Sequence, residues 1–571
     1  MTVPNKEPPP LFRHQQELFE KTRDEIAWAI LYEQGLGKTA PTIRTIEHLY
    51  RLDVIDAVVV VAPNGVHRNW VSDELPKHSG MPYRALDWHS SRAKGQDQAL
   101  DKLLALTPGR RTELAYLSIT YDGMLTPRGR AALLRFCVGE LDLKRGTLVP
   151  NGWKGRFTRF LLVIDEASKV RNPEALRTKK VDALRQFAGY VRLLNGTPIG
   201  NSALDIYSQM KLLDNKFWIR HGIGSFVAFR SRFAILRKIQ VGGEDDRQDR
   251  SPGYQPTVVH DATPEGIAAY EQLDFELDDF LTPAEKKSVI RPTTSSGQEK
   301  KTVGYTKEIV VGFRELDKLK DMITPISTRL TKDDSGVDLP PKLYSRILFD
   351  LPQEQRRAYD QLRKEYMIEL ESGTLITAPI ALVRVLRLQQ IACGYLPNPD
   401  DEDNPKLFYN DDGKNARLQL LLERLEDTPH QAIIWARFTH DVDAITRALG
   451  PPKCTRYDGL VSQKIRDADL DQFKAGKKKF CVAKASSMGM GHSLPMAKSV
   501  FYYSNDFSYI NRLQSEDRAH RLVGGGKEAV CYYDLVAYKT VDEKILSSLR
   551  ECASVADKIT GDSYRSWLSE S

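Results

Sequence analysis

The stretch AWAILYEQGLGKT at 27–39 decides the fold of this chain. Its first six residues are apolar or aromatic, which predicts a strand. The last five residues are Gly35, Leu36, Gly37, Lys38 and Thr39. Glycines let backbone N–H groups close around phosphates at the start of a helix, where Lys38 reaches the outer phosphates and Thr39 supplies a Mg²⁺ ligand. The stretch therefore predicts a nucleotide-binding turn between a strand and a helix.

A pair of carboxylates, Asp165 and Glu166, ends a second apolar run, FLLVID at 160–165. Ligands of parallel sheets gather at the carboxyl ends of the strands, where Asp165 is predicted to hold a metal ion and Glu166 to orient an attacking water. Each motif alone has a plainer explanation. An isolated Asp-Glu pair usually only ends a strand, and Tyr32 stands where the first glycine of the usual phosphate loop belongs. Together, in one block of the chain, they favour an ATP-hydrolysing site.

Two blocks of the chain alternate strand-like apolar runs with helical patterns, which predicts a parallel, doubly wound sheet in each. The runs lie at 57–62, 160–165 and 190–194, and then at 432–436, 480–483, 500–503 and 530–535. Between the blocks, loop-like composition and helical spacing at 267–280 predict a helical insertion. The predicted domains are a first lobe at 1–214, a helical insertion and linker at 215–342, a second lobe at 343–549 and a helical tail at 550–571.

Composition sets broad limits on the protein class. The chain has 571 residues, enough for three or four domains at ~150 residues each. Its 83 basic and 76 acidic residues give a net charge of +7, which permits a polyanionic partner without requiring one. The six cysteines are scattered without zinc-site spacing, and no apolar run approaches ~18 residues. We therefore expect a reduced cytoplasmic protein without a structural metal or a membrane span.

Two arginines near the end of the second block, Arg518 and Arg521, lie three residues apart in QSEDRAHR at 514–521. A helix would present both on one face. Such a pair is usually a solvated patch. The alternative is that the arginines supply positive charge to a γ-phosphate bound by the other lobe.

Taken in order, the motifs resemble those of the SWI/SNF-type helicase-like ATPases of helicase superfamily two, and most of all compact phage and bacterial members. The resemblance extends from Leu11 to about Leu549, and the insertion is its weakest part. It is carried by LFRHQ at 11–15, EQGLGKT at 33–39, VVVVAPNGVHRNW at 58–70, LSITYDGM at 117–124, IDEASKVRN at 164–172, LNGTPIGN at 194–201, STRLTKDDSGVDLPPK at 327–342, IIWARF at 433–438, RYDG at 456–459, SSMGMGHSL at 486–494 and QSEDRAHR at 514–521. The implied fold is two RecA-like α/β lobes in tandem.

The resemblance also implies roles for single residues. Gln15 and Gln514 would join the phosphate loop in binding ATP, and Arg518 and Arg521 would complete the catalytic site made by Lys38, Asp165 and Glu166. The implied metal ligands are Thr39 and Asp165. The implied nucleic-acid track consists of Asn69, Trp70, Tyr121, Thr197, Ser487 and Gly489.

This sequence departs from the family pattern at several positions. Gln34 stands where relatives often carry methionine, and Ser168 takes the fourth place of the DEAH-type box. His492 and Ser493 replace the usual leucine and asparagine. No appended reader domain, zinc finger or nuclease constellation is recognisable, so the expectation is a nearly bare motor.

The resemblance implies a DNA-stimulated ATPase that uses ATP and Mg²⁺ and translocates along duplex or branched DNA. Contacts with the DNA backbone predict salt-sensitive and largely sequence-independent binding. Two alternatives stay open at this point: a strand-separating or annealing helicase in replication or recombination, and a catalytically weak ATP-binding clamp on DNA. We expect a monomeric motor in the cytoplasm of a bacterium or a phage-infected host cell.

Overall fold

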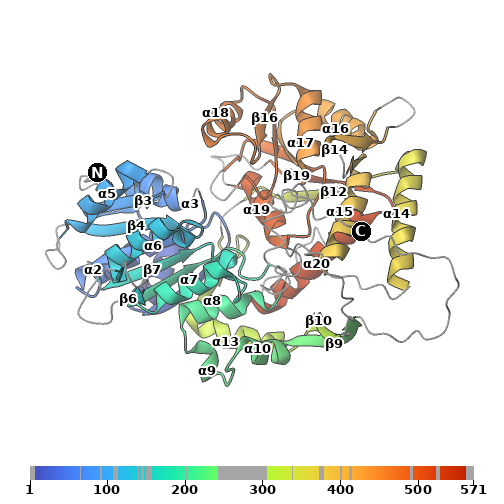
Figure 1. The fold of residues 1–571 in the computed structure, drawn as a ribbon. Helices are drawn as coiled ribbons and strands as arrows, with labels where there is room; N and C mark the ends of the chain where they lie inside the picture. The colour runs from blue at the N-terminus through green and yellow to red at the C-terminus, as the bar shows by residue number, and fades with distance from the viewer. Residues whose placement is uncertain are drawn as a thin grey trace.

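Two α/β lobes lie side by side in the computed structural model of the protein (Figure 1). The structure describes residues 7–560 except 65, 90–92, 107–112, 139–140, 143–146, 149–156, 158, 201, 242–304, 337–338, 372–377, 399–400, 410–413, 489–492 and 522–527. Among the described residues, no helix has the length and apolar character needed to cross a membrane. The two parallel sheets confirm the predicted fold class of tandem RecA-like lobes.

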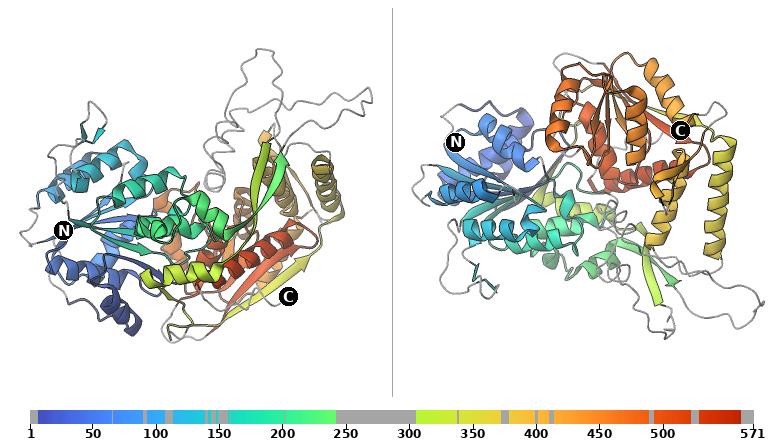
Figure 2. Two further views of the ribbon diagram at one scale, coloured as in Figure 1. Left: turned by 90° about the horizontal axis from the view of Figure 1, so that it is seen from below. Right: turned by 45° about the horizontal axis from the view of Figure 1, so that its top comes forward.

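The first lobe is built on a seven-stranded sheet in the order β11-β1-β8-β7-β2-β4-β3. All neighbouring strands run parallel. Their bounds are β1 Ala27–Tyr32, β2 Ala57–Ala62, β3 Tyr83–Trp88, β4 Leu114–Thr120, β7 Phe160–Asp165, β8 Tyr190–Leu194 and β11 Ser327–Leu330. Every residue of β2 and β7 is buried, because helices cover both faces of the sheet (Figure 2).

The helices of the first lobe pack its apolar residues into one cluster on each face. Along β2, Val58 and Val60 belong to one cluster, while Val59 and Val61 belong to the other. This is the alternation that a strand with two covered faces requires. The main helices are α1 Arg13–Thr22, α2 Thr39–Arg51, α5 Ala93–Leu104, α6 Pro127–Leu133, α7 Leu176–Arg185 and α8 Asp205–Leu213.

The second lobe is built on a six-stranded parallel sheet in the order β12-β19-β18-β15-β17-β16. Its strands are β12 Lys342–Phe349, β15 Gln431–Trp435, β16 Cys454–Tyr457, β17 Phe480–Ala483, β18 Ala497–Tyr502 and β19 Val530–Ala537. Its helices are α14 Gln353–Glu371, α15 Ala378–Ala392, α16 Ala416–Glu426, α17 Thr439–Leu449, α18 Gln463–Lys474, α19 Tyr509–Ala519 and α20 Val541–Thr560. Helix α20 crosses the predicted boundary at 549.

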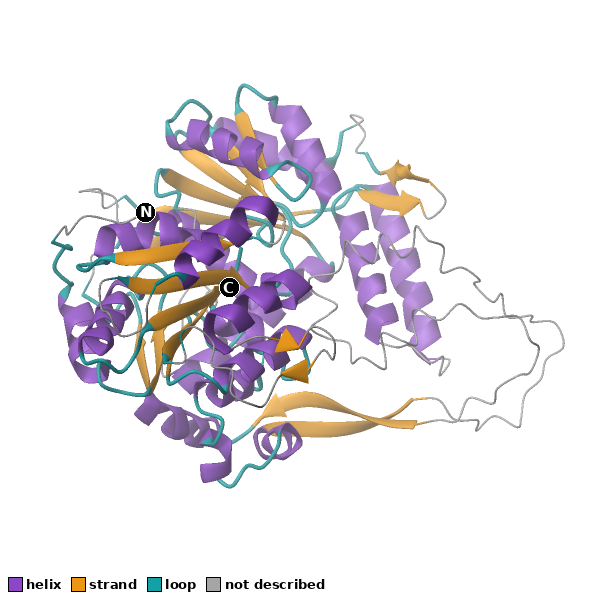
Figure 3. Ribbon diagram, turned by 60° about the vertical axis from the view of Figure 1, so that its left-hand side comes forward, coloured by secondary structure: helices purple, strands orange, loops and turns teal. Residues whose placement is uncertain are grey.

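The predicted insertion is not purely helical. Helices α9 Phe217–Arg220, α10 Phe226–Phe233 and α13 Leu316–Ile323 accompany an antiparallel pair of strands, β9 Ala234–Val241 and β10 Tyr305–Phe313. The pair extends away from the first lobe (Figure 3). The helix expected at 267–280 lies outside the described residues.

The linker prediction also needs a correction at its end. Strand β11, which the sequence analysis places in the linker at 215–342, belongs to the first sheet, where Ser327 to Leu330 pair with Ala29 to Tyr32. The physical reason is that β1 is buried, so its backbone groups need a hydrogen-bonding partner on both sides. The chain therefore returns to the first lobe just before it enters the second.

Candidate active site

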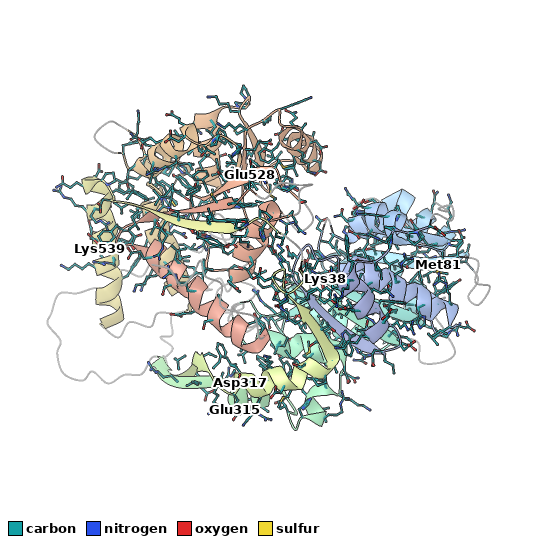
Figure 4. All side chains as sticks on the ribbon, turned by 180° about the vertical axis from the view of Figure 1, so that it is seen from behind. Lys38, Met81, Glu315, Asp317, Glu528 and Lys539 are labelled. Carbon is teal, nitrogen blue, oxygen red and sulfur yellow. The ribbon has the colours of Figure 1, made fainter. Side chains whose placement is uncertain are left out.

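The phosphate loop between β1 and α2 lies on the side of the first lobe that faces the second, as the labelled Lys38 shows (Figure 4). Gly35 and Gly37 have φ angles of 93° and 70°, in the left-handed region that favours glycine. A Cβ on Gly35 would collide with the guanidinium of Arg521, and one on Gly37 would collide with the amide of Gln15. Both glycines are therefore required by backbone conformation and by close neighbours.

Lys38 lies where the helix α2 begins and is surrounded by the other predicted catalytic groups. Its Nζ donates to the carbonyl of Tyr32 at 3.0 Å. Burial lowers the pKa of Lys38, while the carboxylates of Glu166 and Asp165 act to raise it and Arg521 acts to lower it further. The lysine is thus within electrostatic reach of the acidic pair of its own lobe and of an arginine from the other lobe.

Asp165 is held by three groups. Its Oδ1 accepts the backbone N–H of Glu166 at 2.8 Å, and its Oδ2 accepts the indole N–H of Trp70 at 2.8 Å. The hydroxyl of Tyr121 donates to its carbonyl at 2.7 Å. Burial raises the pKa of Asp165, and Trp70 and Lys38 oppose that rise. The carboxylate is therefore fixed in direction at the carboxyl end of β7, where a metal ligand is predicted.

Glu166 is 7% exposed and has a φ of 51°. This left-handed conformation is strained for a residue with a side chain, and such strain often accompanies a functional position. Its Oε1 accepts the amide N–H of Gln34 at 3.2 Å, whereas its Oε2 is buried without a partner among the described residues. Burial raises the pKa of Glu166, and Lys38 opposes the rise. The unpartnered oxygen fits a group that accepts a hydrogen bond from water.

Helix α19 and the residues after it bring the two predicted arginines to the same place. The helix ends at Ala519, so Arg521 lies just beyond it and not on a helix face shared with Arg518. Arg518 is 3% exposed, and burial lowers its pKa to about 10, which the neighbouring Arg521 reinforces and Glu166 opposes. The guanidinium of Arg521 packs against Gly35, and its Nε donates to the carbonyl of Asp517 at 3.0 Å. The burial of Arg518 is incompatible with a solvated patch, so the structure brings both arginines to the phosphate loop and the acidic pair.

Of the remaining predicted nucleotide-binding residues, Gln15, Leu36 and Thr39 lie in or beside the loop. Gln15 donates to the carbonyls of Gly37 at 3.1 Å and Leu36 at 3.4 Å, and its own carbonyl accepts the N–H of Phe12. The side chain of Leu36 is buried, so only its backbone is available to a ligand. Gln514 is a buried residue of α19, and Thr39 is the half-buried first residue of α2.

Two residues of the predicted nucleic-acid track need correction. Trp70 is 1% exposed and Tyr121 is 3% exposed, and both donate hydrogen bonds to Asp165. Buried tryptophan and tyrosine place their N–H and O–H on such partners. Trp70 and Tyr121 therefore hold Asp165, the predicted metal ligand, in place and do not face a strand of nucleic acid.

The other predicted track residues have mixed outcomes. Asn69 ends the short helix α3 Val66–Asn69 and is half-buried, as is Ser487 in the turn after β17. Thr197 is 7% exposed and its N–H donates to Asn195 at 2.9 Å, so it lies in the packed turn after β8. Gly489 lies outside the described residues. Asn69 and Ser487, one from each lobe, stay predictions for nucleic-acid contact.

The structure adds three polar residues that sequence reasoning did not assign to the site. Gln34 contacts Glu166, and Lys332 forms an ion pair with Asp517 at 2.7 Å. Arg329 donates to the carbonyl of Leu31 at 2.6 Å. The departure from methionine at Gln34 could have drawn attention to that position. The partners of Lys332 and Arg329 lie 185 and 298 residues away in the chain, beyond any local pattern.

Comparison with known proteins matches one domain family in each lobe. Residues 22–246 match the SNF2-related domain, and residues 413–523 match the helicase conserved C-terminal domain. The Arabidopsis thaliana Protein CHROMATIN REMODELING 4 is 23% identical over 94% of this chain and 20% of its own length. The Mycoplasma genitalium "Uncharacterized ATP-dependent helicase MG018" is 27% identical over 90% of this chain and 38% of its own length. The chain thus spans between a fifth and two fifths of these relatives.

Among solved structures, the Sulfolobus solfataricus SWI2/SNF2 ATPase core in complex with dsDNA is 22% identical, with coverage of 98% of this chain and 96% of that chain. The TM-score is 0.34. The two matched domains together cover more than half of the chain, one in each lobe. With the similarity to chromatin-remodelling ATPases along nine tenths of the sequence, they show that the chain belongs to the SNF2-type ATPases of helicase superfamily two.

Proposed function

We propose that the protein is a DNA-dependent ATPase that translocates along duplex DNA and remodels protein–DNA or branched DNA structures. One observation carries the proposal. Arg518 of the second lobe acts electrostatically on Glu166 of the first, and Arg521 packs against Gly35 of the phosphate loop. Groups that bind phosphate, orient water and stabilise transition-state charge therefore meet between the lobes.

The residues present fit ATP with Mg²⁺. The loop backbone and Lys38 suit the phosphates, and Thr39 and Asp165 would hold the metal ion, which neutralises charge on the phosphates. The free Oε2 of Glu166 orients the attacking water. Arg518 and Arg521 face the charge that develops on the transferred phosphoryl group.

Closure of the lobes is the step that DNA would control. The arginines belong to the second lobe and the phosphate loop belongs to the first, so hydrolysis requires both lobes to be together. A DNA strand that contacts both lobes, through residues such as Asn69 and Ser487, would favour the closed state. Contacts with the phosphate backbone make this binding sensitive to salt.

The proposal is tested by the rate of ATP hydrolysis with single-stranded DNA, duplex DNA, forked DNA and RNA compared at one salt concentration. We expect duplex-containing DNA to stimulate hydrolysis most. A rate that no nucleic acid changes would support the ATP-binding clamp instead, and a rate that RNA stimulates most would overturn the choice of DNA.

A strand-separating helicase is the alternative, and the projecting antiparallel pair of strands β9 and β10 is the feature that favours it, since a projecting β-structure could divide two nucleic-acid strands. The two motors differ in what they displace. A translocase should remove the third strand of a DNA triplex without unwinding a plain duplex. Unwinding of a tailed duplex without triplex displacement would establish the helicase.

A further inference from the structure

The second residue after β11, Lys332, is a buried lysine that contacts the end of α19 and the residues after it. Lys332 is 5% exposed, and its Nζ lies 2.7 Å from Oδ1 of Asp517. The same Nζ is 3.2 Å from Nδ1 of His520 and 3.2 Å from the carbonyl of His520. One ammonium group therefore holds residues on both sides of Arg518 and directly before Arg521.

The backbone of Lys332 is fixed to the first lobe. It follows β11, which pairs with β1. Its N–H donates to Oε2 of Glu33 at 2.9 Å, and the N–H of Glu33 donates to the carbonyl of Leu330 at 3.0 Å. Glu33 is the first residue after β1 and leads into the phosphate loop. The lysine therefore joins the base of that loop to the end of α19.

A second lysine also contacts α19, but it does so from within the second lobe. Lys342 is the first residue of β12, and its Nζ lies 3.0 Å from Oε2 of Glu516. Because β12 belongs to the second sheet, this ion pair lies wholly within the second lobe. The contact of Lys332 crosses from one lobe to the other, whereas the contact of Lys342 does not.

Asp517 transmits the position of Lys332 to the arginines. It directly precedes Arg518, and its carbonyl accepts the Nε of Arg521 at 3.0 Å. A buried ion pair is weak evidence for stability, because removing two charges from water is costly. Burial lowers the pKa of Lys332 to about 8, with Asp517 opposing the shift. The contact between Lys332 and Asp517 is therefore better explained by its effect on the position of the end of α19 than by a gain in stability.

We propose that Lys332 is a positioning residue: it clips the end of α19 to the phosphate loop when the lobes close, so that Arg518 and Arg521 reach the γ-phosphate. The catalytic part rests on the proposed function, whereas the mechanical part, a clip between lobes, stands on the contacts alone. Because the Lys332 contact joins the two lobes, closure of the lobes and placement of the arginines occur together.

The direct test compares Lys332→Met with the matched control Lys342→Met. Both remove one lysine charge, and both leave a carboxylate of α19 without that partner. We expect Lys332→Met to slow single-turnover ATP hydrolysis by about tenfold to a hundredfold, the cost of a small misplacement of reacting groups. ATP affinity should stay within about twofold, because the phosphate loop is intact. Lys342→Met should stay close to the wild-type rate.

A double variant separates positioning from the cost of an unpaired buried charge. Lys332→Met with Asp517→Asn leaves neither charge in place, so the folded state no longer holds an unpartnered carboxylate. We expect the thermal midpoint to recover towards wild type while hydrolysis stays slow. Recovery of hydrolysis along with stability would overturn the positioning role.

The closing experiment measures lobe closure without hydrolysis, so it remains informative even if the wild-type protein proves not to hydrolyse ATP. Fluorescent labels on Leu52→Cys and Leu460→Cys, positions 54% and 69% exposed in the first and second lobes, report the distance between lobes. With a non-hydrolysable ATP analogue and duplex DNA, Lys332→Met should populate the closed state less than wild type or Lys342→Met. Equal closure in all three proteins, or an equal loss in both variants, would overturn the clip.

Discussion

The two lobes share a parallel sheet covered by helices but differ in the residues that they present to each other. The first lobe presents a glycine loop with Lys38 and the acidic pair Asp165 and Glu166. The second lobe presents Arg518 near the end of α19 and Arg521 two residues after that helix. The difference indicates a division of labour, in which the first lobe binds the nucleotide and the second completes the catalytic charge. Substitutions in the two lobes should therefore separate binding from turnover.

The largest difference between the effect on ATP hydrolysis and the effect on ATP binding is expected at Arg521. Arg521→Lys and Arg521→Ala should each slow single-turnover hydrolysis by about 10³–10⁵, the usual worth of an arginine finger. Lysine fails because it lacks the planar fork of donors. ATP binding should change little. The control is Arg424→Lys on the exposed face of α16, which should hydrolyse like wild type. Rates within a few-fold of wild type for Arg518 and Arg521 variants would remove the second lobe from catalysis.

Two substitutions in the first lobe should differ in whether they weaken ATP binding as well as hydrolysis. Glu166→Gln should slow hydrolysis by about 10²–10⁴ while ATP still binds, since only the water-orienting carboxylate is lost. Lys38→Ala should lose turnover and weaken ATP binding, because it removes a phosphate contact. Equilibrium binding of a fluorescent ATP analogue, measured beside hydrolysis, distinguishes the two. A wild-type rate for Glu166→Gln would show that another residue orients the water.

Trp70→Phe tests whether this side chain serves the metal ligand or the nucleic acid. Phenylalanine keeps a ring in the core but loses the N–H that holds Asp165. We expect the Mg²⁺ concentration for half-maximal hydrolysis to rise about tenfold to a hundredfold, as for other partners of metal ligands. Affinity for duplex DNA should be unchanged. A weaker affinity for DNA with a normal Mg²⁺ requirement would restore Trp70 to the track.

The smallest effect is expected at Gln34. Hydrolysis should fall as pH drops through the pKa of Glu166, because only the ionised carboxylate orients water, and burial raises that pKa. The amide of Gln34 stabilises the ionised form. Gln34→Met, the residue that relatives often carry, should therefore move the acid limb of the pH–rate profile upwards by about one unit. Rates well above that limb should match wild type, and an unmoved limb would contradict the contact's role.

Local patterns explain what the sequence analysis predicted correctly. Buried parallel strands have continuous apolar runs, and the phosphate loop has glycines at two positions of positive φ, so both sheets and the loop were recognisable. The acidic pair follows because ligand sites lie at the carboxyl ends of such strands. These features depend on residues that are adjacent in the chain.

The incorrect predictions concern residues whose partners are far away in the chain. The side chains of Trp70 and Tyr121 are directed by hydrogen bonds to Asp165 at the end of β7, which lies 95 and 44 residues away from them in the chain. Strand β11 has four residues and pairs with a strand about 300 residues earlier. The contact between Lys332 and Asp517 was not predicted because the two residues are 185 positions apart in the chain. Periodicity carries no information about such partners.

The central claim is that the second lobe completes the site made by the first, and that DNA controls this completion. The most direct measurement is single-turnover hydrolysis of pre-bound ATP after addition of duplex DNA. The comparison is between the wild-type protein and the double variant Arg518→Ala with Arg521→Ala. The account predicts a strong acceleration by DNA in the wild type and none in the variant, although both bind ATP equally. Equal acceleration in the two proteins would contradict it.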